Sequence, residues 1–306
     1  MRRWILSVVV MVHSMGFSGE SLFGTEPLVE CEVPGIFAQG SVWRCLTSGH
    51  AGCEGAQWKD GTLYYAAHHD GYAFRWSPQH GLRIWRRDSP EATSFRPDGA
   101  GGFYVVEQTT RQLARWNANG ERVEVLADRF EGKRLNRPND CVVKSDGTVW
   151  FTDPDFLFSK RPEDRKELSG QFVFCWDPRS GGLRRSVEGF NKPNGIVFSP
   201  DEKLLFIGDS GSSELFRMSV KPDGSLGSRE RVAFFAEKGL DGLGFDPMGR
   251  LWVCTARGIT ILAEDGQVLG CLKIPGQPTS LAFGAAGELC VTTRDACFVT
   301  ATQFRP

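Results

Sequence analysis

Five polar side chains occupy equivalent positions in repeated, otherwise apolar segments of the chain. They are Glu54, Asn139, Asn194, Asp241 and Ser280. Each stands 7 or 8 residues before a residue in an expected turn, so the five share one phase within their repeats. Because burying polar groups without partners is costly, these side chains should share water, an ion or a ligand.

Four of the five are hard oxygen donors. Glu54 and Asp241 carry carboxylates, and Asn139 and Asn194 carry amides. Such oxygens suit Ca²⁺, Mg²⁺ or Mn²⁺ better than a metal that prefers sulfur. The set therefore favours one bound divalent cation, and a water-filled channel capped by polar residues is the alternative.

The segments that position these residues repeat one sequence pattern six times: a short apolar run, a turn with Asp or Gly, and a second apolar run. The turn residues are Gly61, Gly99, Gly147, Glu202, Gly249 and Gly287, at intervals of 38, 48, 55, 47 and 38 residues. An Asp-Gly turn between apolar runs predicts a β-hairpin. The 36 glycines and 16 prolines agree with a chain that turns often.

Each hairpin is followed by two further short runs, such as 72–76 and 82–86 after the first. Four short strands per unit are typical of a β-propeller blade. The sixth unit has three expected strands, and we expect the segment 41–46 to pair into it as the outer strand and close the ring. The prediction is an all-β, six-bladed propeller of four-stranded blades, in which the five polar residues meet at one mouth of the channel.

Composition limits the partners. Lys and Arg number 36 against 37 Asp and Glu, a net charge of −1, so no nucleic-acid partner is expected. No run approaches the length of a membrane span. Nine cysteines without a CxxC motif are expected to be mostly small buried residues, and their pairing stays open.

Residues 1–18 have the pattern of a signal peptide. Two arginines precede the apolar run 4–12, and the small residues Gly16 and Ser18 follow it. We expect a leader at 1–18, a single propeller domain at 19–306, and export to the periplasm or the medium. The alternative is a mildly hydrophobic N-terminus on a cytoplasmic protein.

Five segments together resemble a known family. They are Cys53–Trp58 (CEGAQW), Glu131–Asp140 (EGKRLNRPND), Trp150–Pro154 (WFTDP), Pro193–Gly195 (PNG) and Leu240–Leu243 (LDGL). In content and order they resemble the SMP-30/gluconolactonase/LRE-like lactonases, from about Glu54 to Phe283. The segment 131–140 is close to the bacterial gluconolactonase form.

The resemblance implies a six-bladed propeller that hydrolyses a sugar lactone with one divalent cation in its channel, Ca²⁺ before Mg²⁺, Mn²⁺ or Zn²⁺. It implies that Glu54, Asn194 and Asp241 bind the cation and that Asp241 is also the catalytic acid/base. Asn139 would line the substrate site, and Arg137 would reach a substrate hydroxyl or carbonyl. A related hydrolase for another lactone or ester, and a non-catalytic binding module, are the alternatives.

The chain departs from the family pattern at several positions. Ala56 stands where the family usually has Pro, and Ser280 where it often has Asn. Arg137 replaces the Ser of many bacterial members, so a solvated arginine at the rim is an equal alternative to a substrate contact.

Other polar residues are expected at the ends of strands at the same mouth of the channel. Asp153 and Asp209 are expected either to support the site from behind or to serve in turns. The run 68–70 (HHD) is expected to form a turn, because adjacent residues of an extended chain point apart. The longest interval contains the loop 155–170, which we expect at the channel mouth, either as a lid or as an inert excursion.

Overall fold

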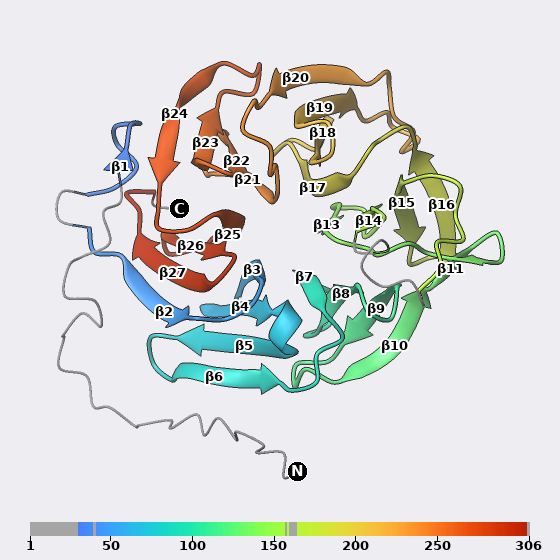
Figure 1. Cartoon of the computed structure of the whole chain (residues 1–306), viewed down its shortest axis with the longest axis horizontal. Coiled ribbons are helices and arrows are strands. Elements are labelled where there is room, and N and C mark those ends of the chain that lie inside the picture. The colour runs from blue at the N-terminus through green and yellow to red at the C-terminus, as the bar shows by residue number, and fades with distance from the viewer. Residues whose placement is uncertain (1–29, 39–40, 157, 159–163, 305–306) are drawn as a thin grey trace, which may run out of the picture.

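Six antiparallel sheets stand in a ring around a central axis in the computed structural model (Figure 1). The structure describes residues 30–38, 41–156, 158 and 164–304. The predicted leader at 1–18 lies outside these residues, as does part of the 155–170 loop. The prediction of an all-β, six-bladed propeller is confirmed.

The first three blades take the strands β3 to β10 and β13 to β16. Blade 1 is formed by β3 (Cys53–Lys59), β4 (Thr62–Ala67), β5 (Tyr72–Ser77) and β6 (Gly81–Arg86). Blade 2 is formed by β7 (Ala92–Pro97), β8 (Phe103–Glu107), β9 (Gln112–Trp116) and β10 (Arg122–Ala127). Blade 3 is formed by β13 (Cys141–Val143), β14 (Val149–Asp153), β15 (Phe172–Asp177) and β16 (Gly182–Val187).

The last three blades continue the ring. Blade 4 is formed by β17 (Pro193–Phe198), β18 (Leu204–Asp209), β19 (Glu214–Ser219) and β20 (Glu230–Phe234). Blade 5 contains β21 (Leu243–Phe245), β22 (Leu251–Thr255), β23 (Gly258–Leu262) and β24 (Val268–Lys273). Blade 6 contains β25 (Pro278–Phe283), β26 (Glu288–Thr293) and β27 (Ala296–Ala301).

An N-terminal strand closes the ring, as predicted. β2 (Arg44–Ser48) pairs antiparallel with β27 and supplies the outer strand of blade 6. Two pairings were not predicted. β1 (Glu30–Cys31) adds a fifth strand to blade 5 beside β24, and the two-residue strands β11 (Arg129–Phe130) and β12 (Lys133–Arg134) form a small hairpin between blades 2 and 3.

Turn chemistry and apolar packing explain the repeat. Asp60 and Gly61, the two residues between β3 and β4, both have positive φ (49° and 70°), as a tight hairpin turn requires. Six separate apolar clusters fill the six gaps between adjacent blades, including the gap between blades 6 and 1. The core is therefore a ring of packed interfaces, because each sheet buries its faces against its two neighbours.

No helix among the described residues is both long and apolar enough to cross a bilayer.

Candidate functional site

A small hollow lies on the axis where the innermost strands of the blades begin. It is lined by Glu54, Gly55, Ala56, Thr93, Arg96, Asp140, Asn194, Asp241, Gly242, Leu243, Thr279, Ser280 and Leu281. Every blade contributes at least one of these residues. The free volume is about 10 Å³, roughly the room for one water-sized sphere. The structure therefore brings four of the five polar residues of equivalent phase to one place, and Asn139 adjoins it through its neighbour Asp140.

Strand pairing is irregular at this level in every blade. The register shifts between Glu54 and Gln57 in blade 1, and shifts of the same kind open the inner strands of blades 2, 4 and 6. In blades 3 and 5 the regular strand begins two residues after Asn139 and Asp241. Such irregularities re-aim side chains, and here they turn polar groups toward the axis.

Glu54 and Asp241 both line the hollow, and Arg96, the cationic side chain in its lining, pairs with Asp140 instead. Burial is the main cause that raises the pKa of Asp241 to about 8, while Arg294 and a hydrogen bond from Asn194 oppose the rise and Asp140 adds to it. Burial, then repulsion from Asp241 and Asp140, raises the pKa of Glu54 well above its usual range. Two such carboxyl groups ionise together only when a positive charge joins them.

Three side-chain oxygens in or next to the hollow are buried and have no hydrogen-bond partner among the described residues. They are Oδ1 of Asn139, Oδ1 of Asn194 and Oδ1 of Asp241. Native structures rarely leave such acceptors unsatisfied without a water or an ion. No three His, Cys, Asp or Glu side chains in the described ranges gather closely enough to hold a metal by themselves, so any site here depends on amide oxygens as well.

Asp140 and Arg96 also line the hollow, and sequence reasoning missed both. Asp140 Oδ1 accepts hydrogen bonds from Ser94 Oγ at 2.7 Å and from Arg96 Nη2 at 3.1 Å, and its Oδ2 accepts one from the Ile196 amide at 3.2 Å. Asp140 therefore ties blade 3 to blades 2 and 4 at the axis. The sequence feature that could have identified Asp140 as a site residue is its position directly after Asn139.

Arg137 is fully buried, so the alternative of a solvated rim arginine is wrong. Its guanidinium binds Glu91 Oε2 at 2.7 Å and Asp164 Oδ2 at 3.0 Å, and Asp164 also accepts a hydrogen bond from Arg111 at 2.8 Å. Asp164 belongs to the described part of the 155–170 loop. Glu91 escaped the sequence analysis because it precedes a strand and lies outside the repeat pattern, and its φ of 51° is unusual for a glutamate.

Asp153 and Asp209 are both buried and neither lines the hollow. Asp209 accepts hydrogen bonds from four backbone amides, those of residues 191, 192, 211 and 212, so it braces two loops. Asp153 Oδ2 accepts one from the Asn136 amide at 2.8 Å, and burial raises the Asp153 pKa to about 8. Asp153 thus holds the segment that carries Arg137 and Asn139.

The histidine run forms a 3-10 turn, η1 (His68–Asp70), at the end of β4. A turn was expected, but the premise that the two histidines diverge is wrong, because their rings lie 3.9 Å apart. His68 Nε2 lies 3.4 Å from Glu54 Oε2. Burial lowers the pKa of His68 to about 3, so this imidazole is neutral at physiological pH.

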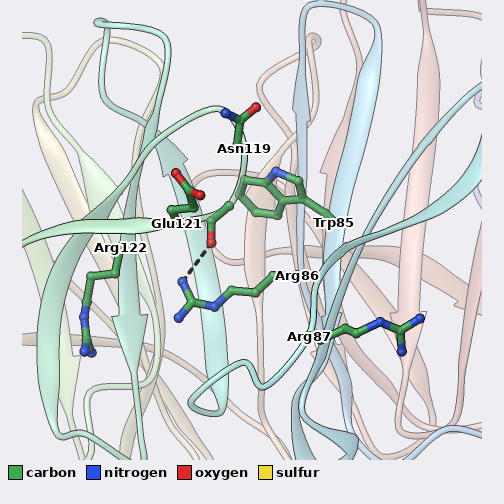
Figure 2. Close-up of a pocket in the computed structure, with 7 residues that line it drawn as sticks. Trp85, Arg86, Arg87, Asn119, Glu121 and Arg122 are labelled. Carbon is green, nitrogen blue, oxygen red and sulfur yellow. Dashed lines mark hydrogen bonds between the residues drawn. The ribbon is translucent and has the colours of Figure 1, made fainter.

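A second, wider hollow of about 430 Å³ lies between blades 1 and 2, where Trp85, Arg86 and Arg122 are among its lining residues. Figure 2 shows that its arginine side chains do not converge on one point. Arg86 donates to the Gly120 carbonyl at 2.7 Å and stacks over Trp116, and Arg122 pairs with Glu107. The contacts of Arg86 join blades 1 and 2, and that of Arg122 lies within blade 2, so these arginines already have partners.

Comparisons with known proteins agree with the fold. The model of the SMP-30/gluconolactonase/LRE-like region matches residues 53–295. A gluconolactonase of Zymomonas mobilis is 32% identical over 240 residues, which cover 70% of this chain and 67% of that protein. A 6-deoxy-6-sulfogluconolactonase of Pseudomonas putida is 28% identical over 74% of this chain and 76% of its own. The solved structure of a gluconolactonase of Xanthomonas campestris superposes with a TM-score of 0.81 at 27% identity, over 89% of this chain and 95% of that one.

Proposed function

The chain belongs to the SMP-30/gluconolactonase/LRE-like family, and from this premise we propose that it hydrolyses a sugar lactone with a divalent cation held in the axial hollow. The names of its relatives support the substrate class, since they include a gluconolactonase and a sulfogluconolactonase. One observation about the site carries the proposal: the largely buried carboxyl groups of Glu54 and Asp241 line the axial hollow with the amide of Asn194, while the Arg96 guanidinium in the same lining pairs with Asp140.

The residues fit a hard divalent cation. The available donors are oxygens only, and the Oδ1 atoms of Asn194 and Asp241 lack partners. Burial is the main cause that raises the pKa values of Glu54 and Asp241, and a bound cation would favour the ionised form of both carboxyl groups. Glu54, Asn194 and Asp241 would hold the ion, with Ca²⁺ favoured over Mg²⁺, Mn²⁺ and Zn²⁺ because the donors are carboxylates and amides.

When bound, the cation would polarise the lactone carbonyl and stabilise the negative charge that develops on its oxygen. Asp241 would accept the proton of the attacking water, because a carboxylate that gives one oxygen to an ion keeps the other for proton transfer. Asn139 would orient the sugar hydroxyls through its unpartnered Oδ1. Arg137 would assist it through its guanidinium, which is fully buried and is fixed by Glu91 and Asp164.

The substrate class is tested by assaying purified protein on a panel of δ- and γ-lactones of sugar acids, with and without a chelator. We expect turnover of at least one sugar lactone that stops on chelation and returns with added Ca²⁺. Glu54→Gln should lose this activity, whereas Glu121→Gln, in the hollow between blades 1 and 2, should keep it.

Hydrolysis of unrelated lactones or esters only would move the chain to another substrate within the family. Binding of lactones without turnover would replace the proposed enzyme by a binding module.

We also propose that the chain is exported, on the strength of the residue pattern at 1–18. Expression of the full chain with a C-terminal tag, followed by cell fractionation and N-terminal sequencing, tests this. Cleavage near Ser18 supports export, and a cytoplasmic protein that retains Met1 or begins at Arg2 contradicts it.

A further inference from the structure

His68 lies directly against Glu54 at the mouth of the axial hollow. Its Nε2 is 3.4 Å from Glu54 Oε2, and the two side chains are only 10% and 12% exposed. No role for this histidine follows from the proposed hydrolysis, in which Glu54 acts only as a ligand. The contact therefore needs its own explanation.

The backbone fixes His68 in this place. The His68 amide donates to the Gly52 carbonyl at 2.9 Å, and the His69 amide donates to the Ala51 carbonyl at 3.2 Å. Asp70 Oδ2 accepts a hydrogen bond from the Ala51 amide at 3.0 Å. The turn η1 is thus bound to the segment that leads into β3, the strand that carries Glu54.

Gly52 makes the room that the imidazole occupies. A Cβ atom at this position would lie 2.3 Å from His68 Nε2 and 2.5 Å from its Cδ2, which no real side chain tolerates. Gly52 also has a φ of 70°, in the left-handed region that favours glycine. The chain therefore places a residue without a side chain where His68 approaches Glu54.

The surroundings of the His68 ring place its Nε2 edge against Glu54. The ring of His69 packs beside it, with ring centroids 3.9 Å apart and planes inclined by 40°, and His69 Nδ1 lies 3.3 Å from Glu91 Oε1. His68 Nδ1 is buried without a partner among the described residues. Of the two ring nitrogens of His68, the structure thus puts Nε2 next to the carboxylate oxygen of Glu54.

We propose that His68 is a positioning residue that orients the Glu54 carboxylate for the axial cation. Groups that hold a metal ligand in place affect cation affinity strongly, typically by about 10- to 100-fold when they are removed. This inference rests on the proposed metal site. It assigns His68 to ligand orientation and not to the reaction itself.

Calorimetric titration of Ca²⁺ into metal-free protein tests the proposal. We expect His68→Leu to weaken binding by about 10- to 100-fold and His68→Gln, which keeps an N–H donor near the Nε2 position, to recover most of the loss. His80→Gln is the matched control, because it alters an exposed imidazole that contacts Ser77 in the turn between β5 and β6, and it should leave affinity unchanged.

A second variant guards against misfolding of His68→Leu. Gly52→Ala should displace the ring and weaken Ca²⁺ binding similarly, and the double variant should bind no worse than His68→Leu alone, because both changes remove one contact. At saturating Ca²⁺ the kcat of His68→Leu should return close to that of the unaltered protein.

The outcomes separate two failures. Wild-type affinity in His68→Leu, with the unaltered protein binding Ca²⁺, would overturn the role of His68 alone. A large loss of kcat in His68→Leu at saturating Ca²⁺ would make His68 part of the chemistry and would also overturn it. Absence of cation binding by the unaltered protein would overturn the metal site, and the inference with it.

Discussion

At the scale of single residues, the site combines groups that the repeat pattern located and groups that it missed. Glu54, Asn194 and Asp241 could be located because each stands at the start of an inner strand, 7 or 8 residues before its turn. His68 and Glu91 could not, because a 3-10 turn and a positive φ place them, and neither leaves a periodic signal. Local backbone departures from extended geometry thus limited the prediction of the site.

The raised pKa of Asp241 predicts a pH dependence. In the metal-free protein the folded state keeps a proton on Asp241 up to about pH 8, whereas the unfolded chain releases it near 3.8. The free energy of unfolding should therefore fall as the pH rises between these values. Ca²⁺ needs the ionised carboxylates, so its apparent affinity should rise with pH up to about 8 and binding should release protons.

Calorimetry in buffers of different ionisation enthalpy counts the released protons. Glu54, Asp140 and Arg294 are the other charged groups that act on Asp241. They should shift the pH at which Ca²⁺ affinity changes without reversing the rise of affinity with pH. An affinity that stays constant between about pH 6 and pH 9 would contradict this explanation.

At the scale of elements, the inner strands approach one another so closely that glycine is required beside the site. A Cβ atom on Gly195 would lie 2.3 Å from the Asp241 carbonyl oxygen of the next blade, and one on Gly242 would lie 2.6 Å from the Thr279 carbonyl oxygen. Each of these glycines follows a proposed cation ligand. Its missing side chain lets the neighbouring blade reach the axis.

Gly195→Ala should therefore damage both the fold and the site. We expect a loss of about 1–3 kcal/mol in the free energy of unfolding, because the added methyl group meets backbone that cannot rotate away. Ca²⁺ affinity should fall as well, because the Asp241 backbone must move. Gly182→Ala is the control, since a Cβ atom there approaches only the Ser180 side chain, its nearest atom Oγ at 3.1 Å. Equal stability of the two variants, measured by chemical denaturation, would show that the blades are not so tightly apposed.

At the scale of the whole molecule, the sixfold pattern predicted the ring because hairpin turns and apolar runs recur locally along the chain. The closing strand was predicted two to three residues too early, since β2 begins at Arg44 and ends at Ser48. β1 was missed because a two-residue strand leaves almost no pattern. Its pairing with β24 depends on the arrangement of the whole ring, which local sequence does not encode.

The closure of the ring can be tested at its seam. Thr47 Oγ1 on β2 lies 3.0 Å from the Tyr65 hydroxyl on β4, so one hydrogen bond joins the closing strand to blade 1. Tyr65→Phe removes it inside the apolar cluster between blades 6 and 1. We expect the free energy of unfolding to fall by about 1 kcal/mol. Tyr104→Phe is the control, because Tyr104 packs between blades 2 and 3, away from this seam. It should lower the free energy of unfolding less.

The central claim is that a cation on the axis makes this propeller a lactonase, and one measurement tests it most directly. Hydrolysis of glucono-1,5-lactone is followed in metal-stripped protein while Ca²⁺ is added back in steps. Because the axial hollow admits about one water-sized sphere, activity should return in proportion to the fraction of chains that bind one ion. Equal hydrolysis by the stripped and the calcium-loaded protein would contradict the claim.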